Sequence, residues 1–577
     1  MKKAAATVTF GLLTVAVVAS LVACRAFSSD QNAAKNTSPT ARSVAARVDK
    51  LFAQWSSTDS PGCSLGVSRN GVTVYERGYG MANLELKVPI TPLTAFHVAS
   101  VSKQFAAMSI LLLAQHGQLS LDDEIRKYIP ELPDYGTRLT IRHLLTHTSG
   151  LREGFTLLGL AAPREDGVDP NDAVVNMLVR QGALNFAPGS DYQYNNGGYT
   201  MLGSIVKRVS GQSLRPFADA NIFKPLGMAH THFHDDPTMI VPNRASGYHR
   251  DAGALHLPLR QDPGGLMGNA GLFTTTRDLL RWEQNFADVR VGDPALVAAM
   301  QKPTVLRGGE TSMYGFGLQI ADHRGLRTIG HGGGDPGFRA YAVRYPDRGL
   351  AITALCNLFE IDPISLTRRV AEIFLTDAFP SADAGPATAP VTLSPEQQSR
   401  FVGLYREPSS ETFGRIFVRD GRLMASGNAG EEGDVVELTP VSANKVIVAG
   451  TSIAAELVPA AAGRPKEIRV TGAGPKNVVS EEVTASFAPS STDLRAFAGH
   501  YYSRELDVTY IVSAADPGLV MHVPGRSDIT LRPLFPDAFH GGAVDVVEFV
   551  RDQRGVVAGF TVNTSSVQRL QFDRVNR

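Results

Sequence analysis

The chain has 577 residues, enough for three or four domains, and 43% of them are hydrophobic, so it can bury substantial cores. Its 56 Lys and Arg residues balance 56 Asp and Glu residues, which gives no reason to expect nucleic acid or an anionic surface as a partner. Three cysteines are too few for a disulfide scaffold, and metal-ligand spacings such as His-Glu-x-x-His are absent from the sequence, so neither a metal nor a cofactor is expected.

The first 24 residues have the features of an export signal. Lys2 and Lys3 precede an almost uninterrupted apolar run, 4–22, and the segment ends in LVAC at Cys24. A small residue before this cysteine resembles the lipobox of bacterial lipoproteins, in which the cysteine becomes the N-terminus and carries a lipid. The resemblance implies a lipid anchor in the membrane and a location in the periplasm or at the cell exterior. An uncleaved anchor is the alternative, since about 19 apolar residues could just span a bilayer.

The polar residues 25–44 are predicted to be a structureless tether, and residues 45–380 one mixed domain. Two strand patterns flank a turn at 69–71, and strand patterns return at 326–357. Between them lie helical patterns, at 102–116, 141–145 and 198–209. Strands at both ends and helices in the middle predict an α+β fold, with an antiparallel sheet built from both ends of the domain and helices around it.

Residues 381–392 are predicted to be a linker because of their Pro, Ala and Gly content. Beyond them, short alternating runs and turn residues replace the helical patterns, which is typical of small antiparallel β-barrels. RFVGLY (400–405) and AFAGHY (496–501) mark a weak repeat of about 96 residues. Two β-barrel domains are therefore predicted, over 393–488 and 489–577.

Ser100 and Lys103 begin an apolar helical stretch. Their i, i+3 spacing places both side chains on one face, and a lysine in a dry pocket has a lowered pKa and can take the serine proton. A helix-capping serine and a solvated lysine are the alternative. The spacing alone is weak evidence, because Ser442 and Lys445 repeat it in a predicted barrel. The residues after Lys103 are apolar on most sides, which predicts a buried helix in which a lysine needs a function.

Two further motifs follow along the chain. Tyr194 and Asn196 form a Tyr-x-Asn just before a helical pattern, and His331 begins the glycine-rich HGGGDPGF. Glycine-rich segments let the backbone approach a ligand closely. A tight turn with a surface histidine is the alternative for the second motif.

In the order SVSK, YNN and HGG, these motifs resemble the Ser-x-x-Lys penicillin-recognising serine hydrolases. That family includes class C β-lactamases, DD-carboxypeptidases, D-aminopeptidases and related esterases. The resemblance extends over about 45–375, through segments such as LTIRHLLTHTSGL (139–151). It implies a β-lactamase/transpeptidase-like catalytic domain, and the two following barrels are similar to the D-aminopeptidase branch.

The resemblance also implies a role for each motif residue. Ser100 would be the acylated nucleophile and Lys103 its general base. Tyr194 would pass the proton to the leaving group, and Asn196 would orient Lys103 and the substrate amide.

The same resemblance places the oxyanion hole at the backbone of Ser100 and of the strand that contains Gly333 and Gly334, with the Gly334 amide as the second donor. One such donor is typically worth about 3 kcal/mol. His331 stands where many members carry lysine. Because a histidine of ordinary pKa is charged only below about pH 6.5, this difference weakens the prediction of an enzyme specialised for penicillin carboxylates.

The sequence thus predicts an exported serine hydrolase that forms an acyl-enzyme on an amide or ester of a small peptide or ester substrate, as a D-amino-acid peptidase, a DD-carboxypeptidase-like enzyme or an esterase. A β-lactamase, or a non-catalytic envelope-binding protein that kept the motifs, are the alternatives. The barrels are expected to cover the catalytic domain and narrow its cleft, the alternative being a ligand site of their own. Cys63 and Cys356 lie on strand-like runs, either as a disulfide, which export permits, or as buried thiols.

Overall fold

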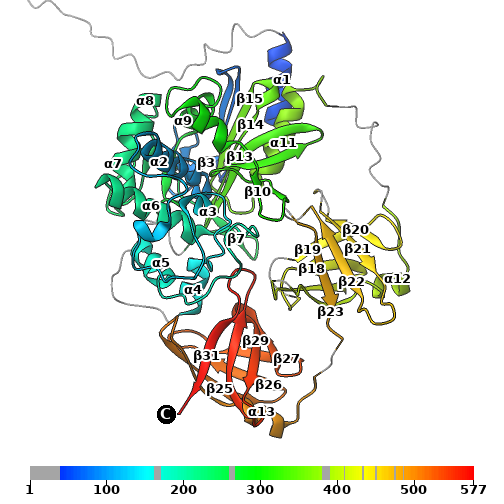
Figure 1. The fold of residues 1–577 in the computed structure, drawn as a ribbon. Helices are drawn as coiled ribbons and strands as arrows, with labels where there is room; N and C mark the ends of the chain where they lie inside the picture. Colours follow the sequence, from blue (N-terminus) through cyan, green and yellow to red (C-terminus); the bar gives the residue numbers. More distant parts are fainter. Residues whose placement is uncertain are drawn as a thin grey trace, which may run out of the picture.

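The computed structural model describes residues 39–161, 170–258, 267–379, 390–408, 410–431, 435–448, 451, 453–472, 476–484 and 487–576. The predicted signal segment with Cys24, and the part of the predicted linker before residue 390, lie outside the described residues. Over the described ranges, no helix combines the length and apolarity that a membrane crossing requires. Figure 1 shows a mixed α/β domain followed along the chain by two β-barrels.

Antiparallel strands from both ends of the mixed domain form its central sheet. Within the described residues the sheet has six strands, in the order β12 (Gln319–His323), β13 (Leu326–Asp335), β14 (Phe338–Tyr345), β15 (Leu350–Cys356), β1 (Cys63–Arg69) and β2 (Val72–Tyr79). The hairpin between β1 and β2 turns at Asn70 and Gly71, which both have positive φ. The predicted α+β architecture is therefore confirmed.

Cys63 and Cys356 are directly opposite each other where β1 pairs with β15, and they form a disulfide. The bond joins strands that lie 293 residues apart in sequence. Of the two alternatives left open by the sequence, the structure contains the disulfide.

Helix α1 (Pro39–Phe52) begins inside the segment that was predicted to be a structureless tether. Val48 and Phe52 of this helix are fully buried, and α1 packs beside α11 (Pro363–Phe374). Residues 39–44 are helical because α1 buries apolar side chains, spaced four apart, in the core beside β1 and β15.

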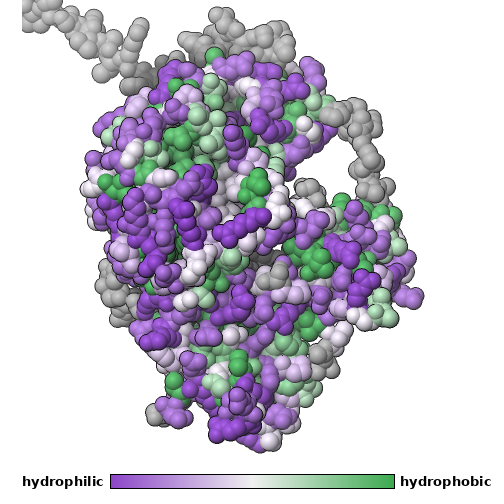
Figure 2. All heavy atoms as spheres, in the orientation of Figure 1, coloured by the Kyte–Doolittle hydropathy of each residue, from purple (hydrophilic) through white to green (hydrophobic). Residues whose placement is uncertain are grey.

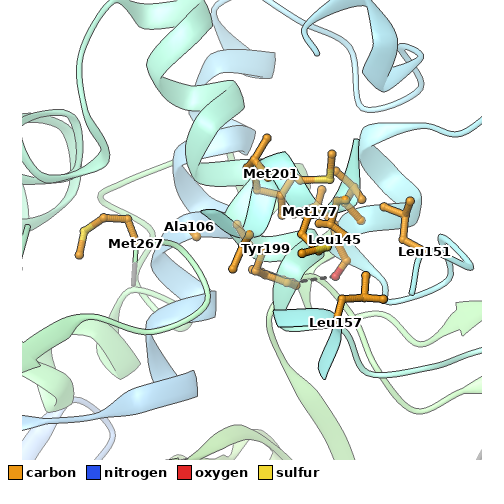
Figure 3. Packing of buried hydrophobic residues seen from close by; sticks show 14 of the residues in the cluster. Ala106, Leu145, Leu151, Leu157, Met177, Tyr199, Met201 and Met267 are labelled. Carbon is orange, nitrogen blue, oxygen red and sulfur yellow. Dashed lines mark hydrogen bonds between the residues drawn. The ribbon is translucent and has the colours of Figure 1, made fainter. Parts of the chain in front are cut away.

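Helix α2 (Lys103–Gln115), whose residues are almost all buried, packs against α6 (Asn196–Ser210) and α7 (Leu214–Ala218). The other helices between α1 and α11 are α3 (Ile141–Leu145), α4 (Gly154–Leu160), α5 (Pro170–Leu178), α8 (Lys224–Leu226), α9 (Thr276–Gln284) and α10 (Pro294–Met300). Figure 3 shows Ala106 of α2 in one cluster with Tyr199 and Met201 of α6, and the Tyr199 hydroxyl donates to the Leu145 carbonyl at 2.7 Å. The predicted buried central helix is present.

Short strands complete this domain: β3 (Met81–Asn83), β4 (Val88–Pro89), β5 (Phe96–His97), β6 (His232–Phe233), β7 (His249–Asp251), β8 (Ala254–His256), β9 (Leu272–Thr274), β10 (Thr304–Val305) and β11 (Thr311–Ser312). The strand β5 leads directly into the turn before α2 and pairs with β9. This pairing fixes where α2 begins.

Two closed antiparallel barrels follow, as predicted. The first contains β16 (Gly403–Arg406), β17 (Phe413–Arg419), β18 (Arg422–Ser426), β19 (Val435–Pro440), β20 (Lys445–Val448), β21 (Ala454–Val458), β22 (Glu467–Thr471) and β23 (Val478–Glu482). The second contains β24 (Gly499–Ser503), β25 (Val508–Ala515), β26 (Gly518–His522), β27 (Ile529–Phe535), β28 (Ala538–Gly541), β29 (Asp545–Arg551), β30 (Val557–Asn563) and β31 (Leu570–Val575). A short helix precedes each barrel, α12 (Pro395–Ser399) and α13 (Ser491–Phe497). Figure 2 shows mainly hydrophilic side chains on the face in view, with smaller apolar areas on the mixed domain and the first barrel.

Candidate active site

Ser100 lies in a tight 3₁₀ turn, Ala99–Ser102, that runs directly into α2. Ala99, immediately before it, has a φ of 46°, a left-handed conformation that costs free energy for any residue with a side chain. The strand β13 presses against this turn, because a Cβ atom on Gly333 would lie 2.1 Å from the Val98 carbonyl oxygen and 3.2 Å from the Ser100 nitrogen. Only glycine fits at position 333, so backbone lies next to the Ser100 amide as an oxyanion hole requires.

Lys103 is fully buried, and its Nζ lies 2.9 Å from Ser100 Oγ. The same nitrogen donates to Asn196 Oδ1 and to the Asn269 carbonyl, each at 2.8 Å. Burial lowers the pKa of Lys103 well below its ordinary value, and the negative charge of Glu153 opposes this only in part. A neutral amine has two hydrogens and one lone pair, so with both hydrogens bonded to these acceptors the lone pair faces the Ser100 hydroxyl.

Tyr194 lies directly before α6, over the lysine. Lys103 Nζ is 4.8 Å from the centre of the Tyr194 ring, and Tyr194 hydrogen-bonds Ser100. Burial raises the pKa of the Tyr194 phenol above its ordinary value, with the bond to Ser100 acting against this. The phenol is therefore protonated at neutral pH and can give a proton and recover it. The side chain of Asn195 caps α6 by accepting from the Gly198 amide at 2.8 Å, which holds Tyr194 and Asn196 on either side of it in place.

His331 lies on β13 with its ring almost fully buried. Its Nδ1 lies 2.5 Å from the Gly332 carbonyl oxygen, which can only accept, and its Nε2 lies 2.9 Å from the Tyr314 hydroxyl. Nδ1 thus carries the hydrogen, and the Tyr314 hydroxyl donates to Nε2. Burial lowers the pKa of His331 to about 3, and Lys103 adds to this when its amine is protonated. The histidine is neutral at physiological pH and is not a cation in the position where many relatives carry lysine.

A cleft of about 680 Å³ brings these motifs together. It is lined on one side by Ser100, Tyr194, His331 and Gly332, Gly333 and Gly334, and on another by Arg339 and the segment 359–364. Lys103 and Asn196 lie directly behind this wall, in hydrogen-bond contact with each other. Of the residues that the sequence singled out as catalytic, Ser100, Tyr194 and His331 therefore line the cleft, and Lys103 and Asn196 are joined to Ser100 through hydrogen bonds.

The second Ser-x-x-Lys pair forms no such arrangement. Ser442 Oγ donates to Asn444 Oδ1 at 2.9 Å, and the Ser442 amide donates to the Lys445 carbonyl at 3.2 Å, in an exposed turn of the first barrel. In the part of the chain that the structure describes, no group of three or more His, Cys, Asp or Glu side chains could hold a metal ion.

Three contributors to the site were not identified from sequence. The Asn269 carbonyl gives no sequence signal, because every residue has a carbonyl group. Tyr314, which positions His331, lies in an ordinary loop pattern. His147 is the third: it is buried with a φ of 58°, its Nδ1 accepts from the Asn195 amide at 3.0 Å, and its ring lies 4.4 Å from that of Tyr194. The segment LTIRHLLTHTSGL contained this histidine, but without a role.

A loop of the second barrel, 564–569, contacts the mixed domain beside Tyr194. Gln193 Nε2 donates to the Ser565 carbonyl at 2.8 Å, and Asn185 Nδ2 donates to the Ser566 carbonyl at 2.9 Å. Arg152, buried in the mixed domain, pairs with Glu505 of the second barrel at 2.7 Å. The second barrel is thus attached close to the cleft.

Comparison with known proteins agrees with this geometry. Residues 42–374, more than half of the chain, match the family model described as Beta-lactamase. The chain belongs to the Beta-lactamase family. A curated relative in this group, Penicillin-binding protein 4* of Bacillus subtilis (strain 168), is 32% identical over 308 residues, which are 50% of this chain and 66% of the relative. D-aminopeptidase of Brucella canis is 30% identical over 297 residues, 52% of this chain and 56% of the relative. The chain thus spans less than two thirds of the length of these relatives.

Solved structures show the same fold. The octameric penicillin-binding protein homologue from Pyrococcus abyssi matches with a TM-score of 0.54 and 22% identity, over 76% of this chain and 99% of that one. The D-amino acid amidase from Ochrobactrum anthropi SV3 matches with a TM-score of 0.51 and 24% identity, over 58% of this chain and 99% of that one. The predicted β-lactamase-like fold is confirmed.

Proposed function

We propose that the chain is a serine hydrolase that forms an acyl-enzyme on Ser100 from an amide or ester. The observation that carries this proposal is the buried lysine. Lys103 Nζ lies 2.9 Å from Ser100 Oγ and donates hydrogen bonds to Asn196 Oδ1 and to the Asn269 carbonyl. Such a lysine is a base directed at the serine and is costly to bury without a function. Membership of the family supports the same reaction class.

In the proposed reaction, Ser100 Oγ attacks the substrate carbonyl while its proton passes to Lys103. The backbone amides of Ser100 and Gly334 stabilise the oxyanion. Tyr194, which contacts both Ser100 and the lysine, delivers a proton to the leaving group. Water then attacks the acyl-enzyme with the same groups in reverse roles.

The charges in the cleft favour a substrate with a free amino group over one with a free carboxylate. His331 is neutral, and the Arg339 guanidinium lies 3.5 Å above the Phe359 ring. Glu360 and Asp362 add two carboxyl groups to the same wall. An α-ammonium group fits this balance, and the D-aminopeptidase relatives support the choice of an N-terminal D-amino acid amide or peptide. β-Lactams, DD-carboxypeptidase substrates and small esters are the competing substrates.

Two further parts of the proposal concern the barrels and the location. The contacts of the 564–569 loop beside Tyr194 support a role of the second barrel in narrowing the cleft. Export with lipidation of Cys24 is proposed from the sequence and is supported by the disulfide between Cys63 and Cys356, since such bonds persist in oxidising compartments.

The test compares the protein lacking its signal segment with its Ser100→Ala variant. The substrates are a D-alanyl nitroanilide, a short-chain nitrophenyl ester and a chromogenic cephalosporin. We expect Ser100-dependent cleavage of the nitroanilide in preference to the cephalosporin. Full activity in Ser100→Ala would reject the mechanism, and failure of every serine-reactive probe to label the protein would favour the non-catalytic alternative.

A further inference from the structure

The strands of the two barrels pair in the same order, and several of these pairs share their register, so the interior positions of one barrel can be matched to those of the other. Tyr405 is opposite Gly414 in the first barrel, and Tyr501 is opposite Tyr510 in the second. The pairs Ile416–Ala425 and Val512–Met521 correspond in the same way, as do Ile468–Ser480 and Phe560–Phe572. At three matched positions, the first barrel therefore has Gly414, Ala425 and Ser480 where the second has Tyr510, Met521 and Phe572.

Large side chains fill this level of the second barrel. The ring centre of Phe572 lies 4.5 Å from that of Tyr510 and 4.7 Å from that of Phe560, and the Phe560 ring is 4.9 Å from Tyr501. All four rings are buried.

Of the four rings, the matched positions of the first barrel retain only Tyr405, and a pocket of about 160 Å³ lies beside Gly414, Ala425 and Ser480. Its walls are mainly aliphatic: Ile416, Leu438, Val448, Ile453, Ala455, Ile468 and Val470. A closed cavity of about 150 Å³ with aliphatic walls stays dry and binds benzene, and this pocket has walls of the same kind but opens to solvent.

Three polar side chains at the cavity have partners within the protein. The Tyr405 hydroxyl donates to the Phe401 carbonyl at 2.7 Å, Ser426 Oγ donates to Asn428 Oδ1 at 2.8 Å, and Arg415 Nε donates to the Ala429 carbonyl at 2.6 Å. Arg415 is the one charged side chain among the described residues of this lining, so a ligand here would gain mainly from apolar burial.

We propose that the first barrel is a binding site for a small, uncharged, mainly apolar molecule about the size of one aromatic ring. The site is separate from the catalytic cleft, and the proposal does not depend on the proposed hydrolase activity. The barrels share a pattern of strand pairing but differ in that the second fills its interior with its own rings and the first accepts a ring from outside.

Toluene is the probe, and benzoate, which has the same ring with a charge, is its matched comparison. Ligand-observed saturation-transfer NMR on the protein lacking its signal segment should show binding of toluene and at least tenfold weaker binding of benzoate. Two variants copy the residues of the second barrel: Ser480→Phe and Ala425→Met. Each should abolish the toluene signal by filling the cavity.

The control is Glu456→Phe, which adds a ring at an exposed, outward-facing position of β21 next to Ala455 and should leave toluene binding unchanged. Circular dichroism establishes that each variant is folded, and the second filling variant decides the outcome if the first does not fold. Absence of toluene binding by the unaltered protein, or binding that survives in a folded filling variant, would overturn the proposal.

Discussion

Replacing Asn196 with aspartate should favour the protonated form of Lys103, the base of the site. The substitution keeps the shape of the side chain but places a carboxylate where Lys103 Nζ now donates to an amide oxygen at 2.8 Å. A nearby negative charge favours the protonated form of lysine, so the pKa of Lys103 should rise.

The size of the effect follows from this distance. Two unit charges 2.8 Å apart attract by about 6 kcal/mol at an effective dielectric constant of about 20, equivalent to about four pKa units. Burial of the new carboxylate opposes the gain, and we expect a net rise of at least about two units. Because the base must be deprotonated, the acid limb of the rate profile should move to higher pH by this amount, so that at a fixed pH on that limb the rate should be roughly 100-fold lower.

The assay is kcat/KM for the D-alanyl nitroanilide between pH 5 and 10. Asn196→Ala is the matched control, since it removes the same hydrogen bond without adding a charge, and it should lower the rate without moving the limb. If folded Asn196→Asp has the same limb as the unaltered enzyme, then Lys103 is not the group whose ionisation controls the reaction.

Three further predictions concern pH, the core and the barrel contact. His331 has a pKa of about 3 in the folded protein and about 6.5 in the unfolded chain, so below pH 6.5 the unfolded state binds a proton that the folded state does not, and the free energy of unfolding falls. His331→Gln removes this effect and should therefore lose about 3 kcal/mol less unfolding free energy between neutral pH and pH 4, measured by denaturant titration at the two pH values. Arg344→Met leaves the buried Glu283 carboxylate without the guanidinium that now lies 2.9 Å away, and this should cost about 3–5 kcal/mol of unfolding free energy. Adding Glu283→Gln removes the unpaired charge and should recover part of that loss. Equal stability of the single and double variants would contradict this account. Glu505→Gln weakens the ion pair with Arg152 that attaches the second barrel beside the cleft. It should change KM for D-alanyl peptides, which are long enough to meet the barrel, but not KM for the small nitroanilide. A parallel change in both KM values would argue against a covering role of the barrel.

Local sequence determined the arrangement of each motif. Ser100 and Lys103 are one turn apart, so any helix that starts there presents both on one face. The alternating strands and the 96-residue repeat likewise determined that two barrels follow, because strand periodicity depends only on neighbouring residues. The position of the tether was less well predicted, since the burial of Val48 and Phe52 depends on a partner sheet formed far along the chain.

Tertiary contacts decided the remaining chemistry. Burial lowers the pKa of Lys103, and this burial exists only in the folded chain, where the amine also donates to the Asn269 carbonyl, 166 residues away. The pairing of Cys63 with Cys356 arose in the same way, from strands that meet only in the folded sheet. Burial and pKa depend on what surrounds a side chain in space, and that is decided when the chain folds, whereas the order of the motifs was already present in the sequence.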